Sequence, residues 1–244
     1  MRQASDIESF FDRAAADYRE AHGSARRLLH YRLELIRSMM RFRPDDRVLE
    51  LGCGPGNHLL PLASCFASAL GTDLSAAMVE VGRQRCHEQG LDGKVDFAAR
   101  NAETLEGVES ASFDAAFCVG AFEHMVDKAA VLRSVARVLR PGGRFGCLTP
   151  NGEWPWYRRI APRLGLATTR LSTDHFVGEV EVRTLLREAG FTDATFGHWT
   201  FVPRGDMPAP WGLAMTTLDA MGRIARVGRW RGGLMFHAVL PRGR

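Results

Sequence analysis

The segment VLELGCGPGNH, residues 48–58, combines an acid with closely spaced glycines. Glu50 is followed by Gly52, Gly54 and Gly56, where an apolar run gives way to polar residues. Glycines let a backbone approach a ligand closely, and the start of a following helix offers free N–H groups. The pattern therefore predicts a ligand-binding loop between a strand and a helix.

Two further polar positions follow apolar runs later in the chain. Asp73 closes the run in ALGTDLS, where a carboxylate can accept both hydroxyls of a ribose. Asn101-Ala102-Glu103 follows the next run, and a polar side chain with a backbone N–H there can read an adenine edge. These positions predict a nucleoside site. Asn57 stands where a G-x-G-x-x-G dinucleotide loop needs its third glycine, which disfavours a nicotinamide dehydrogenase.

Apolar runs and helical periodicities alternate along the chain. Strands are expected at residues 47–51, 67–73, 94–99, 113–119, 144–149, 192–202 and 233–240. Helices are expected at residues 5–20, 24–42, 58–66, 75–88, 128–139 and 180–189, with a helical stripe in an insert at 208–231. This alternation predicts an α/β fold, a parallel sheet between two helical layers, with the last two strands pairing antiparallel at its edge.

Residues 45–150 resemble the class I S-adenosylmethionine-dependent methyltransferases. The resemblance rests on VLELGCGPG, GTDLSAAM, NAETL, FDAAFCVGAFEHMVD and LRPGGRF. It implies a Rossmann-like sheet in the order 3-2-1-4-5-7-6 with strand 7 antiparallel, S-adenosylmethionine as the cofactor and S-adenosylhomocysteine as the product. CVGAFEHMVD, LTPN and DHFVGEVEVRTLLREAGF are similar to the ubiquinone-type small-molecule methyltransferases within this class.

The resemblance also assigns contacts with the cofactor. It implies that Asp73 holds the ribose, that Met78 packs near the adenine and that Arg32 pairs with the methionine carboxylate. Tyr18 would belong to a lid, although Tyr18 and Arg32 could equally be an ordinary packing tyrosine and a solvated arginine. The expected cofactor-binding residues are Tyr18, Arg32, Glu50, Gly52, Cys53, Gly54, Asn57, His58, Asp73, Leu74, Met78, Asn101, Ala102, Glu103, Val119 and Gly120.

Two histidines are candidates for a catalytic base. Methyl transfer to oxygen or nitrogen often uses a base of near-neutral pKa, which suits histidine. His124 follows the strand expected at 113–119, at the edge where open α/β sheets bind ligands, and the resemblance places the loop of His175 beside the substrate pocket. The alternatives are a structural or cofactor contact for His124, a plain loop role for His175, and a reaction driven by proximity without a base.

The residues that directly follow this strand, here called the lip, indicate whether a metal is bound and which class of acceptor is used. Ubiquinone O-methyltransferases carry E-x-x-E-H there, whose acids can hold a divalent metal, whereas residues 120–124 read GAFEH, so no metal site is expected. The lip also lacks the Asn/Asp-Pro-Pro pattern of nucleic-acid amino-methyltransferases. A pocket for an aromatic or lipophilic small-molecule acceptor could be lined by Trp154, Trp156, Tyr157 and Trp211, which could equally pack in the core. O-methylation is preferred over N- or C-methylation.

A single methyltransferase domain is expected over residues 1–244. Residues 1–43 would form a helical lid, residues 44–150 the cofactor-binding core, and residues 151–244 a substrate-side half. No run approaches the roughly 20 apolar residues of a membrane span, and the first residues lack the apolar core of a signal peptide. The five cysteines match no zinc or disulfide pattern. A cytoplasmic location is therefore expected.

The net charge of +4 is unevenly distributed. The insert at 208–231 combines an apolar stripe with Arg223, Arg226 and Arg229, which could reach a membrane surface or a lipophilic substrate, or face only solvent. No nucleic-acid partner is expected. An RNA-modifying enzyme that uses this basic end, or a cofactor-binding protein without catalysis, remains an alternative.

Overall fold

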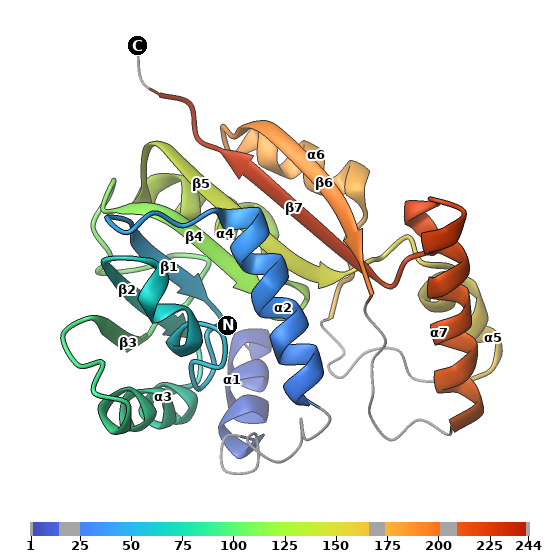
Figure 1. Cartoon of the computed structure of the whole chain (residues 1–244), viewed down its shortest axis with the longest axis horizontal. Coiled ribbons are helices and arrows are strands. Elements are labelled where there is room, and N and C mark those ends of the chain that lie inside the picture. Colours follow the sequence, from blue (N-terminus) through green and yellow to red (C-terminus); the bar gives the residue numbers. More distant parts are fainter. Residues whose placement is uncertain (1, 15–24, 166–173, 201–208, 243–244) are drawn as a thin grey trace.

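The computed structural model describes residues 2–14, 25–165, 174–200 and 209–242. Seven strands form one sheet in the order β3-β2-β1-β4-β5-β7-β6 (Figure 1). Pairs between β1, β2, β3, β4 and β5 are parallel, and β7 runs antiparallel to both β5 and β6. The expected fold class and strand order are confirmed. The strands are β1 (Arg47–Leu51), β2 (Ser68–Asp73), β3 (Val95–Ala99), β4 (Phe113–Val119), β5 (Leu139–Pro150), β6 (Thr192–Trp199) and β7 (Gly233–Val239).

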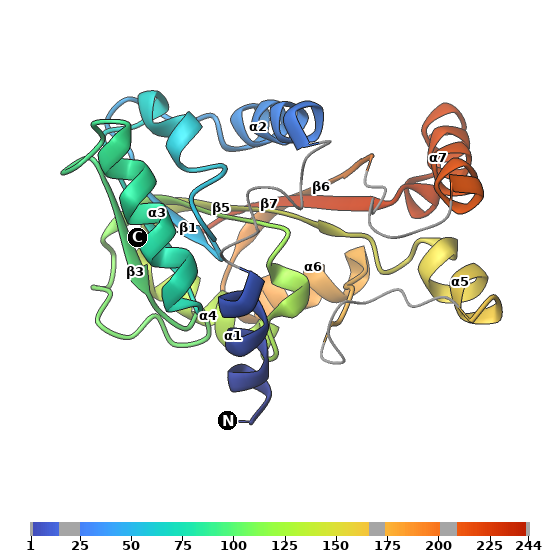
Figure 2. The ribbon, with the colours of Figure 1, turned by 90° about the horizontal axis from the view of Figure 1, so that it is seen from below.

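Helices cover both faces of the sheet (Figure 2). The helices are α1 (Arg2–Ala14), α2 (Ala25–Met40), α3 (Ala76–Glu88), α4 (Lys128–Val138), α5 (Ala161–Arg163), α6 (Glu179–Glu188) and α7 (Ala209–Ile224). One core lies between the sheet and α2 with α3, and a second lies between the sheet and α4 with α6. Successive residues of β4 point to opposite faces, so Phe117 joins the first core and Cys118 the second. This two-sided burial explains why β4 is an unbroken apolar run.

Two expected elements differ in the structure. The helix expected at 58–66 is a short 3₁₀ helix, Leu60–Cys65. Pro61 has no N–H to donate to the carbonyl of Asn57, so the tighter bonding pattern replaces the α-helical one. The strand expected at 144–149 is longer, because β5 begins at Leu139, which pairs with Phe113 ahead of the irregular Pro141-Gly142-Gly143 stretch.

A third, smaller core lies beyond the end of β5. Trp154, Trp156 and Tyr157 are buried there against Met215 of α7. These aromatic side chains, which were expected to line a pocket, therefore pack between α7 and the chain that follows β5. The side chain of Trp211 lies outside the described residues.

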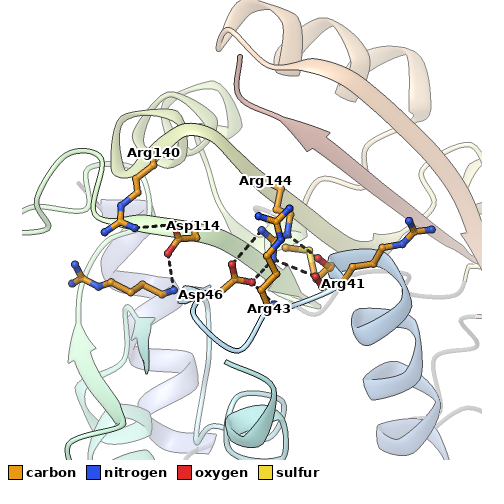
Figure 3. Close-up of polar contacts among 8 residues, drawn as sticks. Arg41, Arg43, Asp46, Asp114, Arg140 and Arg144 are labelled. Carbon is orange, nitrogen blue, oxygen red and sulfur yellow. Dashed lines mark hydrogen bonds and ion pairs between the residues drawn. The ribbon is translucent and has the colours of Figure 1, made fainter. Parts of the chain in front are cut away.

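A cluster of charged residues joins the chain segments at the amino-terminal edge of the sheet (Figure 3). Asp46 forms an ion pair with Arg144 of β5 and accepts the backbone N–H of Arg43 at 2.6 Å. Asp114 accepts the N–H of Arg47 at 2.8 Å and pairs with Arg140 at 2.9 Å. The Asp46–Arg144 side chains are only 4% and 14% exposed, so this pair is screened little by water.

We expect Asp46→Ala to lower the free energy of unfolding by about 3 kcal/mol. The change leaves the guanidinium of Arg144 largely buried without its carboxylate, which costs far more than the loss of a surface pair. Asp114→Ala is the control, because its partner Arg140 is 44% exposed and the expected loss is about 1 kcal/mol. Urea unfolding of both variants measures the difference, and equal losses would contradict the prediction.

Candidate active site

The glycine loop after β1 opens onto a space that it shares with the end of β4. Gly52, Gly54 and Gly56 have φ values of +63°, +51° and +76°, which explains the three glycines. A Cβ at Gly52 would collide with Ala121, so the loop packs closely against the end of β4. A Cβ at Gly54 or at Gly120 would meet no atom within 4 Å. The carboxyl ends of β1 and β4 thus border an open space, as expected for a ligand site in this fold.

Glu50 lies fully buried beneath this loop. Its Oε1 is 3.1 Å from Nδ1 of His58, whereas its Oε2 has no hydrogen-bond partner among the described residues. Burial raises the pKa of Glu50 well above its ordinary value, and the nearby Cys118 and Asp73 raise it further. An unsatisfied buried carboxylate oxygen calls for a donor, and a cationic donor suits it best.

The buried position of Glu50 makes stability depend on pH. Folded Glu50 holds its proton more tightly than the unfolded chain does, so its contribution to stability decreases as pH rises from about 4.5 through the raised folded pKa. Because the amide never ionises, we expect the stability of Glu50→Gln relative to the parent to grow as pH rises above about 4.5, by up to about 1.4 kcal/mol per pH unit. Urea unfolding at increasing pH measures the gain. Glu80→Gln, at a 75% exposed position, is the control, and parallel profiles for E50Q and the parent would refute the idea.

Asp73 connects the glycine loop to the start of α3. Its Oδ2 accepts the N–H of Gly54 at 2.8 Å, and its Oδ1 accepts the N–H of Ser75 at 3.0 Å. Burial raises the pKa of Asp73, and the backbone N–H donors partly oppose this rise. Each carboxylate oxygen keeps a further lone pair for a ligand. Ser75 caps α3 by accepting the N–H of Met78 at 3.1 Å, which sets Leu74 and Met78 beside Asp73.

Helix α1 lies across the carboxyl ends of the strands. Asp12 accepts a hydrogen bond from the hydroxyl of Ser75, and its Oδ1 is 3.4 Å from the N–H of Ala77. The ring of Phe11 lies 5.4 Å from that of His124, in an edge contact. One turn of α1 therefore touches both the start of α3 and the segment after β4. Tyr18, the other lid residue expected, lies outside the described residues.

Several expected cofactor residues make contacts that build the loops. Asn57 accepts from Arg85 at 2.7 Å, and Asn101 accepts the N–H of Glu103 at 2.8 Å. Glu103 in turn accepts the N–H groups of Val126 and Asp127 at 3.2 and 3.1 Å. Asn57 and Glu103 thus hold neighbouring segments, while Asn101 keeps one lone pair for a ligand.

The remaining expected contacts lie at separate points of this edge. The thiol of Cys53 lies 3.4 Å from the carbonyl of Gly54, within the loop. Ala102 is half-buried between Asn101 and Glu103, and Val119 ends β4 just before Gly120. The guanidinium of Arg32 lies 5.6 Å from the ring centre of Trp199, at the end of β6. The structure therefore places Arg32 beside a strand four positions away from β1 in the sheet.

The two candidate histidines have different surroundings. Nδ1 of His124 is 2.5 Å from Oδ1 of Asp174, and their side chains are 13% and 1% exposed. His175 instead pairs through Nε2 with Glu181 at 2.9 Å, and its side chain is 58% exposed. Its backbone N–H binds the carbonyl of Glu123 at 2.9 Å, which fastens the loop to the lip after β4. The structure pairs His124, in the segment that follows β4, with Asp174, a residue that sequence reasoning missed.

The signal for Asp174 was present in the motif STDHF, where an acid precedes the histidine. Whether Asp174 or His175 contacts His124 depends on the direction of each side chain, which sequence spacing alone does not determine. Within the described parts of the chain, no group of three His, Cys, Asp or Glu side chains gathers as a metal site would require.

Comparison with known proteins agrees with this geometry. Residues 48–143, from β1 to the turn within β5, match a protein family described as "Methyltransferase domain". This part of the chain is thus similar to methyltransferase domains. The expected resemblance to S-adenosylmethionine-dependent methyltransferases is thereby confirmed, and with it the expected cofactor.

Curated relatives of the methyltransferase domain include two quinone-pathway enzymes. Ubiquinone biosynthesis O-methyltransferase of Xanthomonas axonopodis pv. citri is 35% identical over 121 residues, which cover 49% of this chain and 49% of that protein. Demethylmenaquinone methyltransferase of Lactiplantibacillus plantarum is 25% identical over 223 residues, or 82% of this chain and 93% of that protein. The chain thus spans about half the length of the first of these relatives.

A solved structure extends the likeness to the whole fold. Geranyl diphosphate C-methyltransferase of Streptomyces coelicolor superposes with a TM-score of 0.71 at 17% identity, covering 100% of this chain and 98% of that one. At this identity the likeness concerns the fold. Within the described residues, no helix is both long and apolar enough to cross a membrane.

The residues of the methyltransferase domain fit S-adenosylmethionine. The unsatisfied Oε2 of Glu50 suits an ammonium group, and the spare lone pairs of Asp73 suit a ribose diol. The open space beside Gly54 and Gly120 leaves room for the methionine half between these acids and the end of β4. The ammonium group and the ribose of the cofactor thus each have a chemically matched residue at this edge.

Proposed function

We propose that the protein transfers a methyl group from S-adenosylmethionine to a hydroxyl oxygen of a small aromatic or lipophilic molecule. The observation that carries the proposal is the His124–Asp174 pair, in which a largely buried carboxylate orients an imidazole of the segment that follows β4. Two of the relatives are named as a ubiquinone biosynthesis O-methyltransferase and a demethylmenaquinone methyltransferase, which supports an acceptor of quinone-like chemistry.

The pairing of His124 defines how the chain would handle the proton. With Nδ1 held by Asp174, Nε2 is the ring nitrogen that would take the proton of the acceptor hydroxyl. The carboxylate of Asp174 would stabilise the imidazolium so formed. S-adenosylmethionine supplies an electrophilic methyl group: the carbon–sulfur bond breaks as the carbon–oxygen bond forms, and the electron pair stays on sulfur. The acceptor oxygen thus loses its proton and gains the methyl group.

The chain would also exclude water from this step. Helix α1 contacts Ser75 at the start of α3 and His124 after β4, so it would lie over the bound cofactor as a lid. Burial of the reacting groups strengthens the attraction between the developing charges. Orientation of the acceptor oxygen in line with the methyl carbon would supply much of the rate enhancement.

Labelled S-adenosylmethionine tests the proposed function directly. The protein is incubated with catechols and hydroquinones that carry alkyl or prenyl tails, with matched anilines, and with RNA. Label on phenolic oxygen supports the proposal. Label on nitrogen, carbon or RNA alone would replace it with that acceptor class, and S-adenosylhomocysteine binding without transfer to any of them would favour a non-catalytic cofactor-binding protein.

A further inference from the structure

Helix α7 exposes an apolar side. Leu213, Met221 and Ile224 are 71%, 50% and 79% exposed. With Thr217, they recur at spacings of four, four and three residues, which places them on one side of the helix. The opposite side carries Met215 and Asp219, both buried. Apolar residues therefore lie on the outer side of the helix as well as at its contact with the third core.

Polar contacts fix α7 in this orientation. Asp219 accepts from Nε of Arg231 at 3.2 Å, from the N–H of Gly232 at 2.8 Å and from the hydroxyl of Thr200 at 2.9 Å. Asn151, directly after β5, donates to the carbonyl of Arg231 at 2.9 Å. These buried bonds join the helix to the ends of β5, β6 and β7. A rotation that hid Leu213 and Ile224 would break them, so the apolar side is held toward the outside.

The same end of the molecule is strongly basic. Helices α5 and α7 both lie at this end (Figures 1 and 2), and the third core joins their segments. Residues 154–165 and 209–231 contain a single acid, Asp219, which is buried against Arg231. Leu164 of the same region is an exposed apolar residue, at 44%. The exposed arginines of the two segments are Arg158, Arg159, Arg163, Arg223, Arg226 and Arg229.

We propose that this surface, made by residues 156–165 and the outer side of 213–229, binds an anionic lipid bilayer. Exposed leucine and isoleucine side chains can enter the headgroup boundary, while arginines around them bind lipid phosphates. Residues 156–165 and 213–229 present no exposed acid, so these segments would not repel a negatively charged surface. A nucleic acid would use the arginines but not the exposed Leu213 and Ile224, so a bilayer accounts for both features.

Vesicle co-sedimentation of the full chain tests this surface without cofactor or acceptor, so its result is independent of the proposed function. We expect binding to vesicles that contain phosphatidylglycerol and little binding to pure phosphatidylcholine. Leu213→Glu/Ile224→Glu and Arg223→Gln/Arg226→Gln should each weaken binding about tenfold or more. Raised salt should weaken it too, because it screens the arginines.

Matched variants elsewhere on the surface serve as controls. Val180→Glu alters a 73% exposed valine on α6, and Arg133→Gln/Arg187→Gln removes the same charge from α4 and α6. Both should bind vesicles as the parent does. Equal losses in test and control variants, no binding to anionic vesicles, or binding that is insensitive to the Leu213/Ile224 change would overturn the proposal. The last result would indicate a general polyanion surface, which RNA or heparin binding would then show.

Discussion

Replacing His124 by alanine should lower kcat for methyl transfer about a thousandfold and leave the affinity for S-adenosylhomocysteine nearly unchanged. The variant removes the proposed proton acceptor, whose contribution in general base catalysis is typically 10²–10⁴-fold. The carboxylate of Asp174 acts through His124, to which it lies at 2.5 Å. Asp174→Asn should therefore lower kcat by about a hundredfold with little change in KM for the acceptor.

The acidity of the acceptor provides a readout that a merely structural role would not affect. A phenol that is already ionised needs no base, so the fall in kcat caused by His124→Ala should be smaller for nitro-substituted acceptors. His175→Ala is the matched control, since this neighbouring histidine is exposed and paired with Glu181, and its kcat should stay within about twofold of the parent. An equal loss across acceptors of all acidities would show that His124 does not act as a base.

Replacing Asp73 by asparagine should weaken S-adenosylhomocysteine binding about a hundredfold, or nearly 3 kcal/mol. A ribose diol gains charge-assisted hydrogen bonds from a carboxylate, and an amide offers one acceptor oxygen without charge. The same change leaves either the N–H of Gly54 or that of Ser75 without its acceptor, since Asp73 serves both. We therefore expect a second effect, a fall of about 1–3 kcal/mol in the free energy of unfolding.

Calorimetry and urea unfolding separate these two effects. Calorimetry is done at a temperature where both proteins are fully folded, so that stability does not enter the apparent affinity. Asp96→Asn, at an exposed position on the neighbouring strand β3, is the control and should change neither quantity. Unchanged affinity for the Asp73→Asn variant would mean that the ribose lies elsewhere, whatever the loss of stability.

Local sequence patterns were sufficient for the framework of this protein. Buried strands such as β4 read as apolar runs, and the glycine loop reads as a position where only residues without a Cβ tolerate a positive φ. The helix expected at 75–88 begins at its capping residue, Ser75, as the serine at that position indicates. The helix expected at 58–66 was wrong in type, since one proline within it removed a donor that the apolar pattern alone does not reveal.

The roles of individual polar side chains needed the tertiary structure. Asp174 and His175 are adjacent in the sequence, yet one is buried against His124 and the other is exposed beside Glu181. Asp12 caps a helix more than 60 residues away, a contact between elements that no local pattern specifies.

The sequence by itself thus predicted the strands, their alternation with helices and the glycine loop, because periodicity and glycine spacing are local properties of the chain. The order of the strands and the class of cofactor were expected from the resemblance to the class I methyltransferases. The tertiary structure decided which histidine has a buried acid partner, where the aromatic residues after β5 pack, and that α7 presents its apolar side outward. These depend on the direction of side chains from distant segments, which only the packed fold sets.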